Sequence, residues 1–459
     1  MVEFAQMRSY QNNLTEGPIL SKLLAFSVPL MLTGLLQLLF NAADTIVVGR
    51  FAGDNSLAAV GATASLVNLI TNLFIGLSIG TNVVAAHYYG AADKKRLAIT
   101  VHTAMLLSVF SGIALTTLGI LFATPILRLM QAPPEVLALS ALYLRIYFCG
   151  MTATMIYNFG AALLRAKGDT RRPLFILLAA GIINVLLNLV FVIPLKMDVA
   201  GVGLATAISQ CFSAVMVVVL LLRETDDFRL SLKKLGINRE IFIQIVKIGV
   251  PAGVQGIIFS FSNIIIQSSV NSFGAMTIAG NSAAMSIEGF VYISMNCFAQ
   301  GTLTFTSQNM GAERHDRVKK AAFCAELCVL VLGLLLGNLA VLFGKPLLHI
   351  YSLNPSVVAA GMSRLRIICT LYCLCGMMDC LANVIRGMGH SFVPMIITLV
   401  GVCGFRVIWI FSVFRMERFH SCETIYYSYP ISWIVALVFL AISLAVLFRR
   451  ISKNAQQAL

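Results

Sequence analysis

Long apolar runs separated by short polar stretches are the dominant pattern of the chain. A helix needs about twenty apolar residues to cross a bilayer. The pattern predicts an all-α integral membrane protein with twelve transmembrane helices, and runs of more than thirty residues predict tilted or bent helices. The predicted spans are 19–48, 56–87, 97–121, 136–163, 173–194, 200–222, 241–272, 277–309, 318–343, 356–385, 391–414 and 425–448.

Short motifs recur at a fixed distance along the chain. GAADKKR at 90–96 matches GAERHDR at 311–317, and LRAKGDTRRP at 164–173 matches IRGMGHSFVP at 385–394. Both pairs are offset by 221 residues. Matches in the same order and at the same offset indicate an internal duplication, which predicts two bundles of six helices each.

The two predicted lobes are 1–222 and 241–459, joined by a charged cytoplasmic loop at 223–240. Six spans in each half give both halves the same orientation, so the repeat is parallel. A duplicated bundle of this kind is typical of transporters that work by alternating access. Pro29 and Pro251 occupy equivalent positions in the first helix of each half. Each is a candidate hinge, or alternatively a static bend.

The basic residues predict the orientation. The chain is 59% hydrophobic and 11% charged, with a mean hydropathy of +0.89 and a net charge of +14. Lysine and arginine gather in alternate loops, around 94–96, 165–172, 223–239 and 314–320. This positive-inside pattern predicts a cytoplasmic-membrane protein with both termini in the cytoplasm. It also argues against nucleic acid as a partner.

The first predicted helix carries three polar residues on one face. Gln37, Asn41 and Asp44 are spaced i, i+4 and i+7, so their side chains line up along the helix. A charged residue within a span costs about 2.5–3.5 kcal/mol on insertion scales and is usually functional. This face is therefore expected to contact protein or water, and to line a cavity.

Three further polar residues are predicted at the depth of Asp44. Asn184 and Asn188 lie one turn apart in the fifth span, and Thr206 lies near the start of the sixth. At 1.5 Å per residue, all three fall in the outer half of the first bundle. One carboxylate with amide and hydroxyl oxygens predicts a site for Na⁺ or a proton. The alternative is that the asparagines only join neighbouring helices.

Charges in the second half allow alternative pairings. Glu288 and Arg406 are predicted at similar depth and could form an ion pair. Asp379 is either part of a substrate or proton site or the partner of Arg386. Arg364 is interpreted as an anchoring residue that reaches toward the polar surface. Glu288 and Asp379 remain candidates for the cavity.

Signals for catalysis are weak. GLSIG at 76–80 fits G-x-S-x-G, but the motif needs a strand–turn–helix elbow and lies here in an apolar span. No zinc-protease, P-loop or dinucleotide motif is found. We predict a protein that is not an enzyme, that has no cofactor, and that draws on an ion gradient or works passively.

The chain resembles the multidrug and toxic compound extrusion (MATE) family of cation-coupled efflux transporters. The similar segments occur in family order along nearly the whole chain. They are FNAADTIVVGR, GAADKKR, LLRAKGDTRRP, IINVLLN, GVGLATAISQ, QNMGAERHDR and IRGMGHSFVP. The resemblance implies a V-shaped cleft between two lobes. It also implies export of cationic or amphipathic small molecules in exchange for Na⁺ or H⁺, by a monomer surrounded by membrane lipids.

The resemblance also implies roles for particular residues. In the branch coupled through the N-terminal lobe, the motif maps onto Gln37, Asp44, Asn184, Asn188 and Thr206. Many members have aspartate at the position of Asn188, so Asp44 alone would carry the charge here. The remaining polar positions that match the lobe cavity are Tyr143 and Asn158. Glu288 and Asp379 are the candidates for the acidic positions of the other branch, although Asp379 lies about one helical turn from where that branch places its aspartate.

Two other functions compete with cation-coupled export of drugs or toxic metabolites. A lipid-linked oligosaccharide flippase of the wider superfamily should have several arginines in its cavity and additional spans, whereas most arginines here lie in loops. A non-transporting membrane scaffold would not need a duplicated bundle with acids inside its spans.

Overall fold

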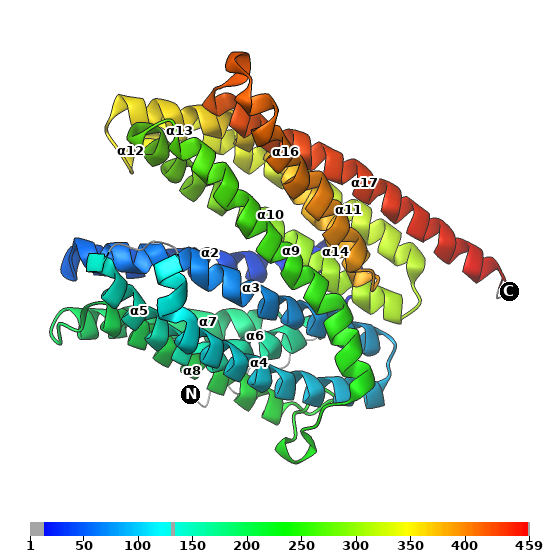
Figure 1. The fold of residues 1–459 in the computed structure, drawn as a ribbon. Coiled ribbons are helices and arrows are strands. Elements are labelled where there is room, and N and C mark those ends of the chain that lie inside the picture. Colours follow the sequence, from blue (N-terminus) through cyan, green and yellow to red (C-terminus); the bar gives the residue numbers. More distant parts are fainter. Residues whose placement is uncertain (1–12, 130–133, 458–459) are drawn as a thin grey trace. The chain divides into compact units, whose positions relative to one another are not determined.

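The computed structural model describes residues 13–129 and 134–457, and all regular structure in this part of the chain is helical (Figure 1). The first half contains α2 (Ile19–Phe51), α3 (Asp54–Gly90), α4 (Lys94–Leu129), α5 (Pro134–Cys149), α6 (Met151–Ala166), α7 (Arg171–Val192) and α8 (Asp198–Arg223). The second contains α9 (Arg239–Asn271), α10 (Ala275–Gly311), α11 (His315–Leu342), α12 (Gly344–His349), α13 (Pro355–Ile368), α14 (Tyr372–Gly387), α15 (Phe392–Thr398), α16 (Phe405–Phe411) and α17 (Cys422–Gln457).

Fewer helices qualify as spans by length and apolar composition alone than the twelve predicted. Within the described residues, ten helical segments are long and apolar enough to cross a bilayer, and the bent pair α5–α6 makes eleven. The predicted span at 277–309 corresponds to α10, which has 37 residues and is not among them. Serine, threonine, asparagine and glutamine recur along α10, so it contains no sufficiently apolar stretch.

Three predicted spans are interrupted helices. The axes of α5 and α6 differ by 45° at Gly150, where a side chain would meet the backbone of Ala207 in α8. A 3₁₀ turn at Cys369–Leu371 separates α13 from α14. A π-helical segment, Leu399–Gly404, joins α15 to α16. Such π-helical segments are rare and frequently occur at functional sites.

The internal repeat is visible in the backbone. Gly53 and Gly274 precede α3 and α10 with φ/ψ of 88°/171° and 88°/173°. Gly168 and Gly389 have φ of 94° and 88° after α6 and α14. Each pair is 221 residues apart, the offset found in the sequence motifs. Positive φ favours glycine because glycine has no Cβ, so the turns that end equivalent helices are conserved between the two halves.

The chain forms two compact units. Unit 1 contains residues 32–253, and unit 2 contains residues 14–31 and 254–459. The boundaries therefore fall inside α2 and α9, each of which contributes to both units. Pro29 and Pro251 lie within the two helices, next to these boundaries.

Glycines allow close helix packing at equivalent places in both units. In unit 1, Gly76 and Gly80 of α3 pack backbone to backbone against Gly249 and Gly253 of α9. The GLSIG segment is thus a G-x-x-x-G helix-packing motif, in which small residues let two backbones approach. In unit 2, Gly301 of α10 packs against the start of α2.

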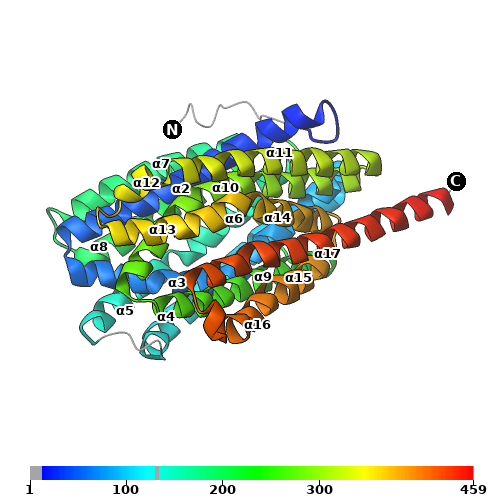
Figure 2. The same cartoon turned by 90° about the horizontal axis from the view of Figure 1, so that it is seen from above.

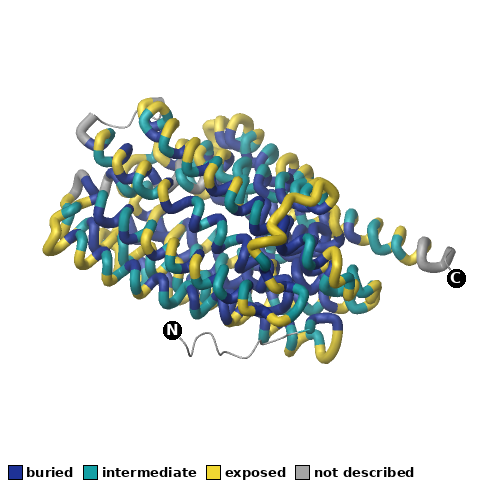
Figure 3. Tube along the Cα trace, turned by 90° about the horizontal axis from the view of Figure 1, so that it is seen from below, coloured by how far each residue is buried: buried dark blue, intermediate teal, exposed yellow. Residues whose placement is uncertain are grey.

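Each unit has its own packing layers. In unit 1, α7 and α8 run side by side, and α6 packs against α8 (Figure 1). In unit 2, α10 packs against α11, α13 and α14, and α13 lies beside α17 (Figure 2). Exposed positions recur along the helices in Figure 3, and many carry large apolar side chains such as Val331 and Ile442. This exposure is expected for surfaces that face lipid.

Candidate functional site

Asp44 lies half-buried on α2 in unit 1. Its Oδ1 accepts a 2.5 Å hydrogen bond from Nδ2 of Asn188 on α7. No basic residue in the described part of the chain forms a salt bridge with Asp44. A carboxylate in a span without a cationic side chain is costly when charged. Its position therefore suits a carboxylate that binds an exchangeable cation or proton.

A chain of hydrogen bonds extends from Asp44 to α8. Asn188 Nδ2 lies 3.3 Å from Oδ1 of Asn184, and Asn184 Nδ2 donates to Oγ1 of Thr206 at 3.3 Å. Thr206 in turn donates to the carbonyl of Val202 at 3.0 Å. The buried Oδ1 of Asn188 accepts no hydrogen bond from a described residue. A free amide oxygen beside a carboxylate is a suitable ligand for a hard cation such as Na⁺.

Tyr143 of α5 lies in the apolar cluster next to this network. It packs with Val47 and Val48, which follow Asp44 on α2. The Tyr147 ring is 5.9 Å from the Tyr143 ring. These aromatic and branched side chains form an apolar cluster next to the polar network.

Three other predicted positions do not join the network. Gln37 and Asn41 are exposed on α2. Asn158 is half-buried on α6 and makes no side-chain hydrogen bond to another described residue. The structure thus connects Asp44, Asn188, Asn184 and Thr206, but not the whole polar face of α2.

No group of three or more histidine, cysteine, aspartate or glutamate side chains suited to a metal ion occurs among the described residues. A site built on Asp44 would instead use one carboxylate with neutral oxygens. That ligand set matches Na⁺ or a proton rather than a transition metal.

Glu288 pairs with Arg364 in unit 2. The two Arg364 nitrogens Nε and Nη2 each lie 2.8 Å from a carboxylate oxygen of Glu288, and Nη1 donates to Asn281 at 2.8 Å. The predicted pair between Glu288 and Arg406 is therefore wrong, as is the interpretation of Arg364 as a surface anchor. Arg364 is buried because α13 turns this residue toward α10, where a two-point carboxylate contact satisfies its charge.

Asp379 has a tyrosine rather than an arginine as its partner. Tyr292 of α10 donates to Oδ2 of Asp379 at 3.1 Å, and Asn296 lies 3.3 Å from the same hydroxyl. Arg386 instead bonds the side-chain oxygens of Asn383 and Gln255, each at 2.8 Å. The alternative of an Asp379–Arg386 ion pair is therefore wrong, because neutral amides occupy the guanidinium.

Glu288, Asp379 and Arg406 line one cavity of unit 2, with a volume of about 410 Å³. Aromatic side chains form much of its wall, including Tyr292 and Trp433. This size and lining are typical of sites for small organic molecules.

Glu326 of α11 is an acid that the sequence analysis missed. Both of its carboxylate oxygens are buried, and neither has a hydrogen-bond partner among residues 13–129 and 134–457. Cys380 of α14 is its polar neighbour. The signal was available, because Glu326 is an acid inside the predicted span 318–343 in the same way that Asp44 is in 19–48.

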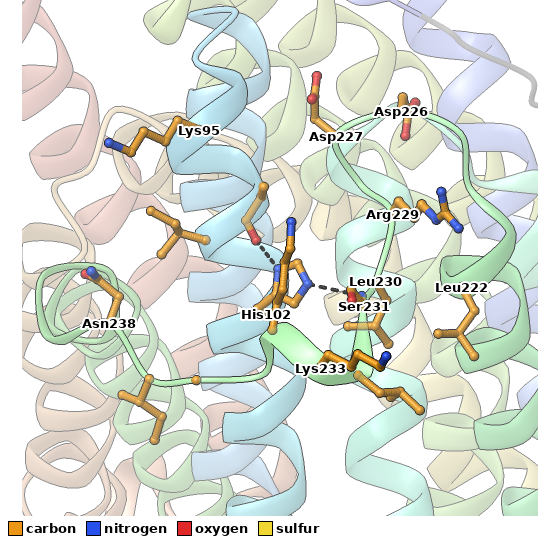
Figure 4. Close-up of a pocket in the computed structure, with 16 residues that line it drawn as sticks. Lys95, His102, Leu222, Asp226, Asp227, Arg229, Leu230, Ser231, Lys233 and Asn238 are labelled. Carbon is orange, nitrogen blue, oxygen red and sulfur yellow. Dashed lines mark hydrogen bonds between the residues drawn. The ribbon is translucent and has the colours of Figure 1, made fainter.

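A larger cavity, of about 1010 Å³, lies between α4 and the loop after α8 (Figure 4). His102 joins this loop to α4, because its Nε2 accepts from the Ser231 amide at 3.1 Å and its Nδ1 lies 2.6 Å from the Ala98 carbonyl. Nearby, Lys167 contacts Glu224 at 2.6 Å and Asp226 at 2.5 Å. These paired acids and bases fasten the loop. The cavity is lined by aliphatic side chains such as Leu230 and Ile237, without the tyrosine and tryptophan rings of the unit 2 cavity.

Comparison with known proteins agrees with this architecture. The MatE family profile matches residues 29–190 and 251–412, one copy in each half. The probable multidrug resistance protein YoeA of Bacillus subtilis is 26% identical over 90% of both chains. The probable multidrug resistance protein NorM of Thermotoga maritima is 23% identical over 84% of this chain and 83% of its own length.

Solved structures share the fold. A crystal structure of a MATE transporter in complex with MaL6 superimposes with a TM-score of 0.90 at 22% identity, covering 97% of this chain and 99% of that one. The expected all-helical membrane fold with an internal repeat is confirmed. With two MatE repeats that together span most of its length, this multi-pass membrane protein belongs to the MatE family of multidrug efflux transporters, which are not enzymes.

Proposed function

We propose that this protein exports small organic compounds, organic cations among them, in exchange for Na⁺ or H⁺, and that Asp44 is the coupling carboxylate. The observation that carries the proposal is the Asp44–Asn188 contact. Asp44 has an amide donor but no basic partner among the described residues. A carboxylate satisfied this way stays free to exchange a cation, whereas Glu288 is held by Arg364.

The ligand set supports this role. Thr206 Oγ1 lies along the same hydrogen-bond chain as Asp44, and Asn188, which is part of that chain, also has an amide oxygen that accepts no hydrogen bond from a described residue. A bound Na⁺ would draw on the carboxylate and these neutral oxygens, whereas a proton would neutralise the carboxylate directly. Either event neutralises the net charge of the site. A neutral site on α2 prefers a less polar environment than a charged one. Ion binding can therefore favour one of the two conformations of a transporter over the other.

Pro29 and Pro251 serve as the hinges in this proposal. Each lies within three residues of the point where its helix passes from one unit to the other. Proline lacks the amide hydrogen for the helical ladder, so each helix can change its bend there at low cost. The predicted lobes 1–222 and 241–459 would alternate access about these points, with both termini in the cytoplasm.

Transport from reconstituted vesicles tests the proposal. The full chain is placed in vesicles loaded with a fluorescent organic cation, and an inward Na⁺ gradient or an inward proton gradient is imposed separately. We expect one of the two gradients to drive export of the dye against its own gradient. Export at the same rate without any ion gradient would contradict coupling.

A further inference from the structure

Arg406 is a buried arginine at an interruption of its helix. It is the second residue of α16 and directly follows the π-helical segment Leu399–Gly404. Only 2% of its surface is exposed, and its Nε donates to Ser432 of α17 at 2.9 Å. Its guanidinium carbon lies 4.1 Å from the Tyr429 ring centre and 5.9 Å from that of Trp433.

The charge of Arg406 has no carboxylate partner in the described part of the chain. Both oxygens of Glu288 are taken by Arg364, and Asp379 accepts from Tyr292. A buried arginine is normally paired, because desolvation penalises an isolated charge. Contacts with aromatic faces offset only part of that cost.

The terminal nitrogens of Arg406 are available to the unit 2 cavity. Nη1 and Nη2 have no hydrogen bond to a described residue. They are also not fully enclosed by protein atoms. Arg406 lines the 410 Å³ cavity, so these donors are the groups it can offer to a molecule bound there. A guanidinium offers two parallel donors that match the two oxygens of a carboxylate.

The surroundings of Arg406 favour a flat apolar body next to that anion. The ring centres of Trp433 and Tyr372 lie 5.4 Å apart, and their ring planes differ by 31°. Tyr429 completes the aromatic wall. Aromatic side chains pack with other rings in offset or edge-on arrangements. The cavity therefore combines an aromatic wall with the unpaired cation of Arg406, and the carboxylate of Asp379, which accepts from Tyr292, lines it as well.

We propose that the unit 2 cavity binds aromatic compounds that carry a carboxylate or a related oxyanion, and that Arg406 receives the oxyanion. The assignment extends the substrates of the proposed exporter beyond organic cations. Its place in export rests on the proposed function, whereas binding itself does not.

Binding can be read from one tryptophan. The chain has two tryptophans, Trp409 and Trp433. A Trp409→Phe background leaves Trp433 as the only reporter, at the cavity wall. The purified full-length protein is titrated in detergent with 4-nitrobenzoate and, separately, with 4-nitrobenzyl alcohol. Both quench tryptophan emission, but only the first carries an oxyanion.

We expect 4-nitrobenzoate to bind roughly tenfold more tightly than the alcohol, because its oxyanion makes charge-assisted hydrogen bonds. Arg406→Gln should remove this preference and leave the alcohol affinity unchanged. Arg415→Gln, at an exposed arginine of the same segment, should keep it. Equal affinities in the Trp409→Phe protein, or a preference that survives Arg406→Gln, would overturn the proposal.

A more conservative substitution keeps the test valid if Arg406→Gln does not fold. Circular dichroism and gel filtration check each variant, and Arg406→Lys replaces Arg406→Gln if the latter does not fold. Lysine keeps the charge but loses the two-point contact. The preference should then shrink, and an undiminished preference would refute the assignment. No ion gradient enters this measurement, so a failure of ion coupling would leave its result unaffected.

Discussion

Asn188 of α7 donates a 2.5 Å hydrogen bond to the carboxylate of Asp44 on α2. Asn188→Ala removes this donor and the unpaired amide oxygen beside it. A hydrogen bond to a charged group contributes about 1.5–3 kcal/mol. The ion concentration for half-maximal efflux should therefore change by roughly tenfold or more. Efflux measured across a series of Na⁺ and proton concentrations gives this value. Asn158→Ala is the control, and an equal effect there would argue against a specific role for Asn188.

Glu288 and Glu326 should respond oppositely to the same substitution. Glu288→Gln leaves Arg364 buried without its partner, and breaking a buried pair costs about 3–5 kcal/mol. Glu326→Gln removes a buried acid that has no hydrogen-bond partner among the described residues, so stability should stay equal or rise. Thermal unfolding in detergent compares the two variants. A loss of stability for Glu326→Gln as large as that for Glu288→Gln would show that Glu326 has an ionic partner.

The negative charge of Asp379 should weaken the binding of anions in the unit 2 cavity. Asp379 and Arg406 line the same cavity but form no ion pair with each other. Asp379→Asn removes a negative charge, which across several ångströms is worth about 1 kcal/mol at an intermediate dielectric. The affinity for 4-nitrobenzoate should therefore rise roughly fivefold, with no change for the neutral alcohol. Weaker binding of the anion would contradict a shared cavity.

Gly253 should tolerate no side chain. A Cβ there would lie 2.6 Å from the backbone of Leu73, too close for a carbon contact. Gly253→Ala should destabilise the protein by about 1–3 kcal/mol through overpacking. Gly61→Ala is the matched control, because a Cβ at Gly61 meets no atom of a described residue within 4 Å. Alanine favours a helix over glycine, so the control should unfold at the same or a higher temperature.

The sequence predicts most helices because membrane spans are read from apolar length alone. It also groups Asp44, Asn188 and Thr206, because a constant rise per residue converts sequence position into depth. Hydrogen bonds link these side chains through Asn184 in the structure. Their role in ion coupling stays a prediction.

The depth of a residue in the membrane does not predict the direction in which its side chain faces around the helix axis. Arg364 and Arg406 both lie deep enough to reach an acid, and only the facing of α13 and α16 decides which of them pairs with Glu288. The 3₁₀ turn at Cys369–Leu371 and the π-helical segment at Leu399–Gly404 alter these facings. A regular 3.6-residue period cannot anticipate such interruptions. α10 differs for another reason, since its polar residues make it a poor span by composition.

The central claim is that the charge of Asp44 couples ion entry to export. The most direct measurement compares gradient-driven dye export by the unmodified protein, Asp44→Asn and Asp198→Asn in vesicles with equal amounts of folded protein. Asp198 is an exposed acid at the start of α8 and serves as the control. We predict that Asp44→Asn abolishes export driven by either ion gradient, while Asp198→Asn exports normally. Normal export by Asp44→Asn would contradict the account.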